Sequence, residues 1–219
     1  MFFIFRIHTL LSCLYVFINI QKYNYYLFLY CLSLFWRSVF IADWNTNITE
    51  RFSYADNILF SKFSDRVIAT IGEISLIFHY TLKFNKPELM FLISAAETVA
   101  WFSLLKFDSW YQYSIEYNLW SFIYFIISID YFNINCFKKF LIYFSISTLI
   151  YMTNIVELYK YRKRLLKKKK ESLKINFINS LKTNNISKSW KDWADNLNWM
   201  LPIFVGGSLT VVFVENLIY

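Results

Sequence analysis

The sequence is poor in the residues that build most catalytic and metal sites. In 219 residues it has two histidines, His8 and His79, and three cysteines, Cys13, Cys31 and Cys136. No CxxC pair or Cys/His cluster is present, so we expect neither a zinc site nor a disulfide framework. The chain also lacks HExxH, GxSxG and phosphate-loop motifs. We therefore expect no metal and no cofactor.

Glycine, proline and charge are scarce as well. There are three glycines and two prolines, and charged residues make up 17% of the chain. Hydrophobic residues reach 57% and aromatic residues 22%, far above the composition of soluble domains. An A+T-rich genome would raise the Phe and Tyr content by itself, so the number of aromatic residues carries no weight. The long runs that the apolar residues form are the useful signal.

Seven apolar stretches each approach the roughly 20 residues that cross a bilayer as a helix. They are residues 1–21, 25–43, 67–84, 89–105, 117–133, 140–156 and 201–219. A spanning segment must satisfy its own backbone hydrogen bonds, and these lengths indicate helices rather than barrel strands. We predict an all-α, polytopic membrane helix bundle of about seven transmembrane helices, in one domain over residues 1–219. The count falls to six if the first stretch is cleaved or lies at the interface.

The net charge of +8 comes from one basic strip, residues 159–174, which holds nine Lys or Arg and one acid. The rest of the chain is neutral. A neutral body with one juxtamembrane strip indicates topology and anionic lipid rather than nucleic acid. We place the strip on the cytoplasmic or equivalent side of an endomembrane or the mitochondrial inner membrane. The expected lipid contacts are Lys167, Lys168, Lys169 and Lys170.

The segment between the strip and the last apolar stretch has a helical stripe. Trp190, Trp193, Leu197 and Met200 fall on one side of an amphipathic pattern. This pattern predicts a helix that lies in the membrane interface, so residues 159–200 form a strip followed by a surface helix. A solvated loop with scattered tryptophans is the alternative.

Three charges lie inside the apolar stretches, where they are costly: Arg37, Glu73 and Glu97. At 1.5 Å per residue, each lies roughly 9 to 13 Å inside the cytoplasmic boundary. Small residues surround both glutamates and favour close helix packing. The spacing therefore permits one cluster in which the arginine faces two carboxylates. Asp65, at the start of the third stretch, is assigned to the helix dipole.

Three hypotheses fit these charges: a buried ion pair that fixes helix packing, a pocket for a lipid or small amphiphile, and a proton path. For the pocket, Glu73 and Glu97 are the candidate catalytic residues. The candidate ligand-binding residues are Arg37, Trp101, Glu116 and Trp120. The function expected from this pocket is binding or modifying a lipid or small hydrophobic molecule. The alternative is a structural accessory subunit of a larger membrane complex, such as a mitochondrial one, with protein partners within the membrane.

Overall fold

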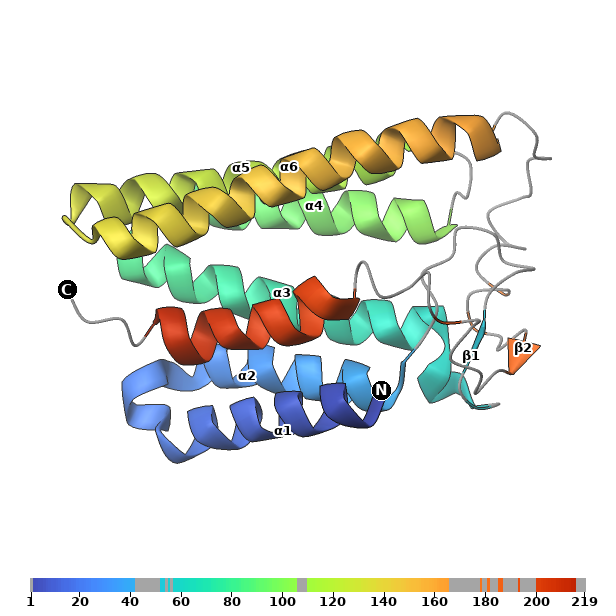
Figure 1. The fold of residues 1–219 in the computed structure, drawn as a ribbon, viewed down its shortest axis with the longest axis horizontal. Coiled ribbons are helices and arrows are strands. Elements are labelled where there is room, and N and C mark those ends of the chain that lie inside the picture. The colour runs from blue at the N-terminus through green and yellow to red at the C-terminus, as the bar shows by residue number, and fades with distance from the viewer. Residues whose placement is uncertain are drawn as a thin grey trace. The chain divides into compact units, whose positions relative to one another are not determined.

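The computed structural model describes most of the chain. The described residues are 2–41, 52, 53, 55, 57–105, 110–165, 178, 181, 185, 186, 193 and 200–215. They are almost entirely helical (Figure 1).

Six α-helices and two π-helical segments make up this part of the chain. They are α1 (Phe2–Ile18), α2 (Ile20–Val39), α3 (Lys62–Phe84), α4 (Glu88–Leu105), α5 (Trp110–Asn133), α6 (Phe137–Leu165), η4 (Leu201–Gly207) and η5 (Thr210–Val214). A 3-10 turn, η2 (Ile58–Phe60), precedes α3, and two-residue strands β1 (Phe52–Ser53) and β2 (Asn185–Ile186) pair in parallel. Where they are described, the seven predicted apolar stretches are almost wholly helical, which confirms the all-α class.

Two helical segments are long and apolar enough to cross a membrane among the described residues, Lys62–Phe84 and Phe137–Val156. Two shorter apolar helices are Phe3–Ile18 and Pro202–Val212. Length and composition alone do not separate a membrane span from the core helix of a soluble protein.

Contacts between residues divide the chain into two compact units, which we describe separately. The first unit comprises residues 1–76 and 177–216, and the second comprises residues 77–176 and 217–219. Helix α3 contributes its first half to one unit and its second half to the other. The prediction of one domain over residues 1–219 stays a prediction.

In the first unit, α1 and α2 form an antiparallel hairpin, drawn in blue in Figure 1. The hairpin turns through Asn24, which has a left-handed φ of 64°. Its Oδ1 accepts hydrogen bonds from the backbone N–H groups of Tyr26 and Leu27, at 3.1 and 3.2 Å. Asn24 thus acts as an N-cap that restarts the helix after the turn.

Glycine allows two close approaches to α2 in the first unit. A Cβ at Gly72 of α3 would overlap the side chain of Ser33. A Cβ at Gly207 would lie 2.5 Å from the Tyr30 hydroxyl. A side chain at position 72 would therefore displace Ser33 of α2, whereas at position 207 the neighbouring atom is the end of the Tyr30 side chain, which can shift.

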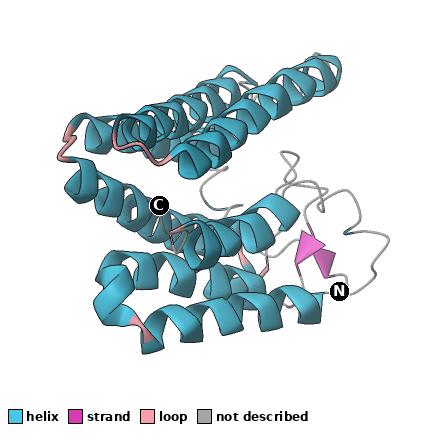
Figure 2. Ribbon diagram, turned by 60° about the vertical axis from the view of Figure 1, so that its left-hand side comes forward, coloured by secondary structure: helices cyan, strands magenta, loops and turns pink. Residues whose placement is uncertain are grey.

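In the second unit, α5 and α6 lie side by side at the top of Figure 2, and the colours of Figure 1 show that they run antiparallel. Polar side chains join them: the Ser121 hydroxyl donates to the Ser147 carbonyl at 3.0 Å, and the Asn154 amide donates to Asn118 at 2.9 Å. The hydroxyls of Tyr80 and Tyr143 are hydrogen-bonded to each other. Small hydroxyls and amides between helices are typical of packing inside membranes.

Helix α6 is longer than the sequence predicted, because it continues to Leu165 and includes the beginning of the basic strip. Lys167 to Lys170 lie outside the described residues. So does most of the predicted surface helix. Its described members, Trp193 and Met200, are both buried.

Candidate functional site

Arg37 lies in the last turn of α2 with only 2% of its surface exposed. Its Nε donates to Asp65 Oδ1 at 2.9 Å, and its Nη2 donates to Asp65 Oδ2 at 3.4 Å. Its Nη1 lies 3.6 Å from Glu73 Oε1. The planar guanidinium thus contacts Asp65 with two nitrogens, which is the strongest geometry for an arginine–carboxylate pair.

The other charges of the site all come from α3. Asp65 lies in the first turn, and Arg66 and Glu73 follow it on the same helix. Because seven residues are about two helical turns, Arg66 and Glu73 share one face of α3. The Arg66 Nη2 donates to Glu73 Oε2 at 3.0 Å. One helix therefore supplies two carboxylates to an arginine of its neighbour and a second arginine to one of those carboxylates.

We call Arg37, Asp65, Arg66 and Glu73 the charge network. It contains two positive and two negative groups, and it is buried apart from Glu73, whose side chain is 15% exposed. Removing one partner of a buried ion pair typically costs about 3 to 5 kcal/mol, because the remaining charge loses its compensation. The network therefore ties α2 to α3 through groups that depend on one another.

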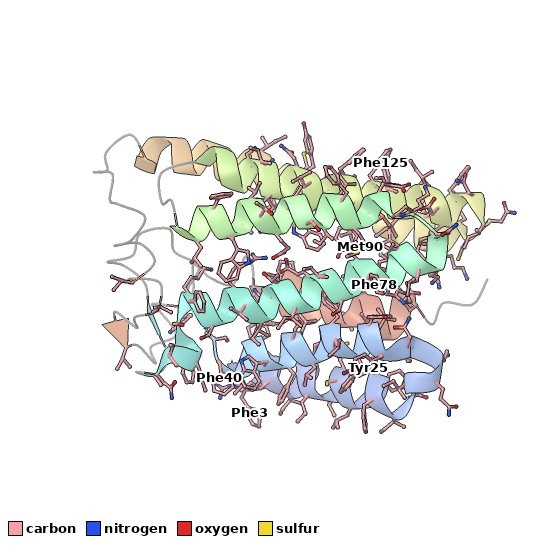
Figure 3. All side chains as sticks on the ribbon, turned by 180° about the vertical axis from the view of Figure 1, so that it is seen from behind. Phe3, Tyr25, Phe40, Phe78, Met90 and Phe125 are labelled. Carbon is pink, nitrogen blue, oxygen red and sulfur yellow. The ribbon has the colours of Figure 1, made fainter. Side chains whose placement is uncertain are left out.

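A third arginine, Arg6, binds the C-terminal end of α2, close to Arg37 in sequence. Arg6 of α1 donates to the backbone carbonyls of Ser38 and Val39, both at 3.2 Å. The hydroxyls of Thr9 and Ser38 lie 2.8 Å apart. A cation at the carbonyl end of α2 interacts favourably with the negative pole of the helix dipole. Figure 3 labels Phe40, the residue that follows α2 at this end.

The remaining predicted site residues belong to the second unit. Glu97 is buried on α4, and Trp101 lies one turn further along and is half-buried. Glu116 and Trp120 are half-buried on α5, where the Trp120 ring stacks on Tyr124 at 5.8 Å between centroids. The predicted single cluster with Arg37 stays a prediction for these residues, as do the catalytic and ligand-binding roles.

The second carboxylate that contacts Arg37 is Asp65, for which the sequence predicts an interaction with the helix dipole. Asp65 does lie at the N-terminal end of α3, but its side chain also pairs with Arg37. Arg66 is a further member of the site that was not predicted from the sequence. Its seven-residue spacing from Glu73 was the signal that could have found it.

Comparison with known proteins adds no relative to this description. No protein-family model matches the chain, and neither do curated proteins or solved structures. Among the described residues, no group of three His, Cys, Asp or Glu side chains is arranged to hold a metal ion.

Proposed function

We propose that this chain is an integral membrane protein. The observation that carries the proposal is the stripe of large apolar side chains exposed on α5. These residues are Ile115, Phe122, Phe125, Ile129 and Phe132, and Figure 3 labels Phe125. Ser121 and Ser128 of the same helix are buried. In water the opposite arrangement is stable, whereas in a bilayer the apolar face contacts lipid and polar groups pack between helices.

Helix α6 has the same distribution. Leu141, Phe144 and Met152 are exposed, while Ser147 and Asn154 are buried and hydrogen-bonded to α5. Its apolar segment is also long enough to span the membrane. The two helices support one proposal: their outer surface contacts lipid.

Within the membrane, we propose a structural role for the charge network. Glu73 has one oxygen against Arg37 and the other against Arg66, and Arg37 contacts both carboxylates. Groups engaged in this way hold helices together and are poorly placed to contact a ligand. The function that follows is that of a non-catalytic membrane component, such as an accessory subunit of a larger complex.

Binding or modification of a lipid is the second candidate. It is favoured by the position of Glu73, the most exposed side chain of the charge network. In this mechanism Glu73 would exchange a proton with the bound molecule, and Arg37 would hold its anionic group.

Membrane integration is tested by extracting cell membranes with alkaline carbonate. We expect the chain to stay in the membrane pellet and to require detergent for release. Release into the carbonate supernatant would overturn the proposal of an integral membrane protein.

The two functions are separated by the mass of the native particle after mild detergent extraction. A stoichiometric place in a large assembly supports the structural role. A monomer or dimer that carries one defined lipid, and loses it in Glu73→Gln or Glu97→Gln while remaining folded, supports lipid binding and contradicts the structural role.

A further inference from the structure

The chain leaves the first unit through α3 and returns to it after α6, and a pair of short strands joins the two ends of this passage. Strand β1 precedes α3 and strand β2 follows α6, yet Phe52 pairs with Asn185 and Ser53 pairs with Ile186. Four helices, α3, α4, α5 and α6, lie between the two strands in sequence. The beginning and the end of this four-helix segment are therefore held together within the first unit.

Helices α5 and α6 contact each other along the whole apolar segment of α6. At one end, the Asn154 amide donates to Asn118 at 2.9 Å. At the other end, the ring centroids of Phe132 and Phe140 are 5.3 Å apart. The apolar segment Phe137–Val156 is long enough to cross a bilayer. Because α5 accompanies this segment from one end to the other, α5 covers the same distance.

The end of α3 lies beside the end of α5. The Lys83 Nζ, in the last turn of α3, donates to the Tyr131 hydroxyl near the end of α5 at 2.8 Å. Directly after α3, the Lys86 Nζ lies 2.6 Å from Asp130 Oδ1. Residues 85–87 join α3 to α4. The chain therefore enters α4 at the end of the second unit where α5 stops.

Helix α4 must carry the chain from this end to the opposite end, because α5 begins there. Helix α4 contacts α5, and its 18 residues have a length of about 27 Å at 1.5 Å per residue. This length is close to the roughly 30 Å of the hydrocarbon core of a bilayer. Helices α4, α5 and α6 thus run in alternating directions over similar distances.

We propose that α3, α4, α5 and α6 all cross the membrane and that β1 and β2 lie together on one side of it. Four crossings return the chain to the side from which it started, as the pairing of the strands requires. An odd number of crossings would put the strands on opposite sides. The inference rests on the proposal that the chain is an integral membrane protein, and it adds the number of crossings and the side of each connection.

The segments that join the strands to the helices are unsuited to a further crossing. Residues 54–61 join β1 to α3 and include the turn Ile58–Phe60, so they are too short to span about 30 Å. The segment between α6 and β2 includes Lys167 to Lys170, and lysine is costly inside a bilayer. Both strands therefore lie on the side where α3 begins and α6 ends. The connections α3–α4 and α5–α6 lie on the other side.

The test uses the full chain in sealed membrane vesicles and a maleimide that does not cross membranes. The three natural cysteines are replaced by alanine, and one cysteine is then introduced in each variant. Four reporters replace residues that are exposed, and the fifth replaces the residue that follows α4 in sequence. The variants are Ile58→Cys, Ile186→Cys, Glu88→Cys, Ile134→Cys and Lys106→Cys.

We expect the reporters to fall into two groups. Ile58→Cys, Lys106→Cys and Ile186→Cys should be labelled from the same side of the membrane. Labelling of Glu88→Cys and Ile134→Cys from that side should fall to background and return when the vesicles are permeabilised. Opposite sides for Ile58→Cys and Ile186→Cys would overturn the proposal. So would labelling of Lys106→Cys from the same side as Glu88→Cys, because α4 would then not cross.

A control in the middle of α5 distinguishes failure of the topology from failure of membrane integration. Phe125 is one of the exposed apolar residues of α5, so Phe125→Cys should stay unlabelled in intact membranes. If this variant is protected and the reporters group differently, the four crossings are wrong and the membrane proposal stands. If all six variants react in intact vesicles and the chain is released by carbonate, both proposals are wrong.

Discussion

At the scale of single residues, the pair formed by Arg37 and Asp65 joins α2 to α3 in the first unit. Replacing Asp65 by Asn removes the carboxylate that lies 2.9 Å from the buried guanidinium, whereas Glu73 lies 3.6 Å from it. We expect Asp65→Asn to lower the free energy of unfolding by about 3 kcal/mol. Glu73→Gln removes the carboxylate charge that faces both Arg37 and Arg66, but it should cost less because the Glu73 side chain is 15% exposed and better solvated than that of Asp65. Unfolding of the purified protein in detergent measures both values.

The control for this prediction removes both charges together. A double variant, Arg37→Met with Asp65→Leu, leaves no uncompensated charge and should recover much of the lost stability. A single Asp65→Asn variant as stable as the wild type would show that the charge network does not hold the two helices.

The buried charges could be predicted from the sequence, but not all of the residues with which they pair. The position of Arg37 and Glu73 in apolar stretches gives their depth along a helix, since each residue advances about 1.5 Å. Depth does not give the rotation of a helix about its axis. The choice of Asp65 as partner depends on that rotation, and on a pairing across 28 residues of chain.

At the scale of secondary structure, the approach of α3 to α2 depends on Gly72. We expect Gly72→Ala to destabilise the protein by about 1 to 3 kcal/mol, because its Cβ would overlap Ser33 and force the helices apart. Gly206→Ala is the matched control, since a Cβ there meets no atom within 4 Å. The control should be neutral or slightly stabilising, because alanine favours helix over glycine. Equal effects of the two substitutions in thermal unfolding would contradict this interpretation.

The helices themselves were predictable, because apolar runs of this length are compatible with few structures other than a helix. Their ends were less predictable. Helix α6 runs to Leu165, past the last apolar residue of its predicted stretch, because lysine and arginine are good helix formers and extend a helix into a polar environment. The restart of α2 at Asn24 depends on a left-handed φ, which asparagine adopts more readily than most residues but does not require.

At the scale of the whole molecule, a membrane protein and a soluble protein differ in what the exposed stripe of α5 contacts, lipid or water. We expect Phe125→Lys to lower the fraction of chain that resists carbonate extraction, because a lysine facing lipid costs about 2.5 to 3.5 kcal/mol near the centre of a helix. Phe125→Leu, the control, should integrate as the wild type does. If the lysine variant integrates fully, or becomes more soluble without loss of folding, the stripe faces water and the membrane proposal is wrong.

The basic strip sets the predicted orientation of the molecule. Replacing Lys167, Lys168, Lys169 and Lys170 by Gln should weaken binding to liposomes that contain anionic lipid, or scramble the topology read by protease protection. The physical reason is the attraction of several lysines to a negatively charged membrane surface. No change in either assay would reduce the strip to a solvated segment.

The partners in the charge network are synthesised one after another, so the network forms only after α3 has been made. Arg37 leaves the ribosome 28 residues before Asp65. In a membrane-inserted chain, as proposed, the α1–α2 hairpin would therefore enter the bilayer before α3 supplies a carboxylate to the guanidinium. At that stage the hairpin is held together by hydrogen bonds of its own. Arg6 donates to the carbonyls of Ser38 and Val39, and the hydroxyls of Thr9 and Ser38 are hydrogen-bonded. Arrival of α3 then completes the pairing, and nascent chains stalled before Asp65 should slip back from the bilayer more readily than chains stalled after Glu73.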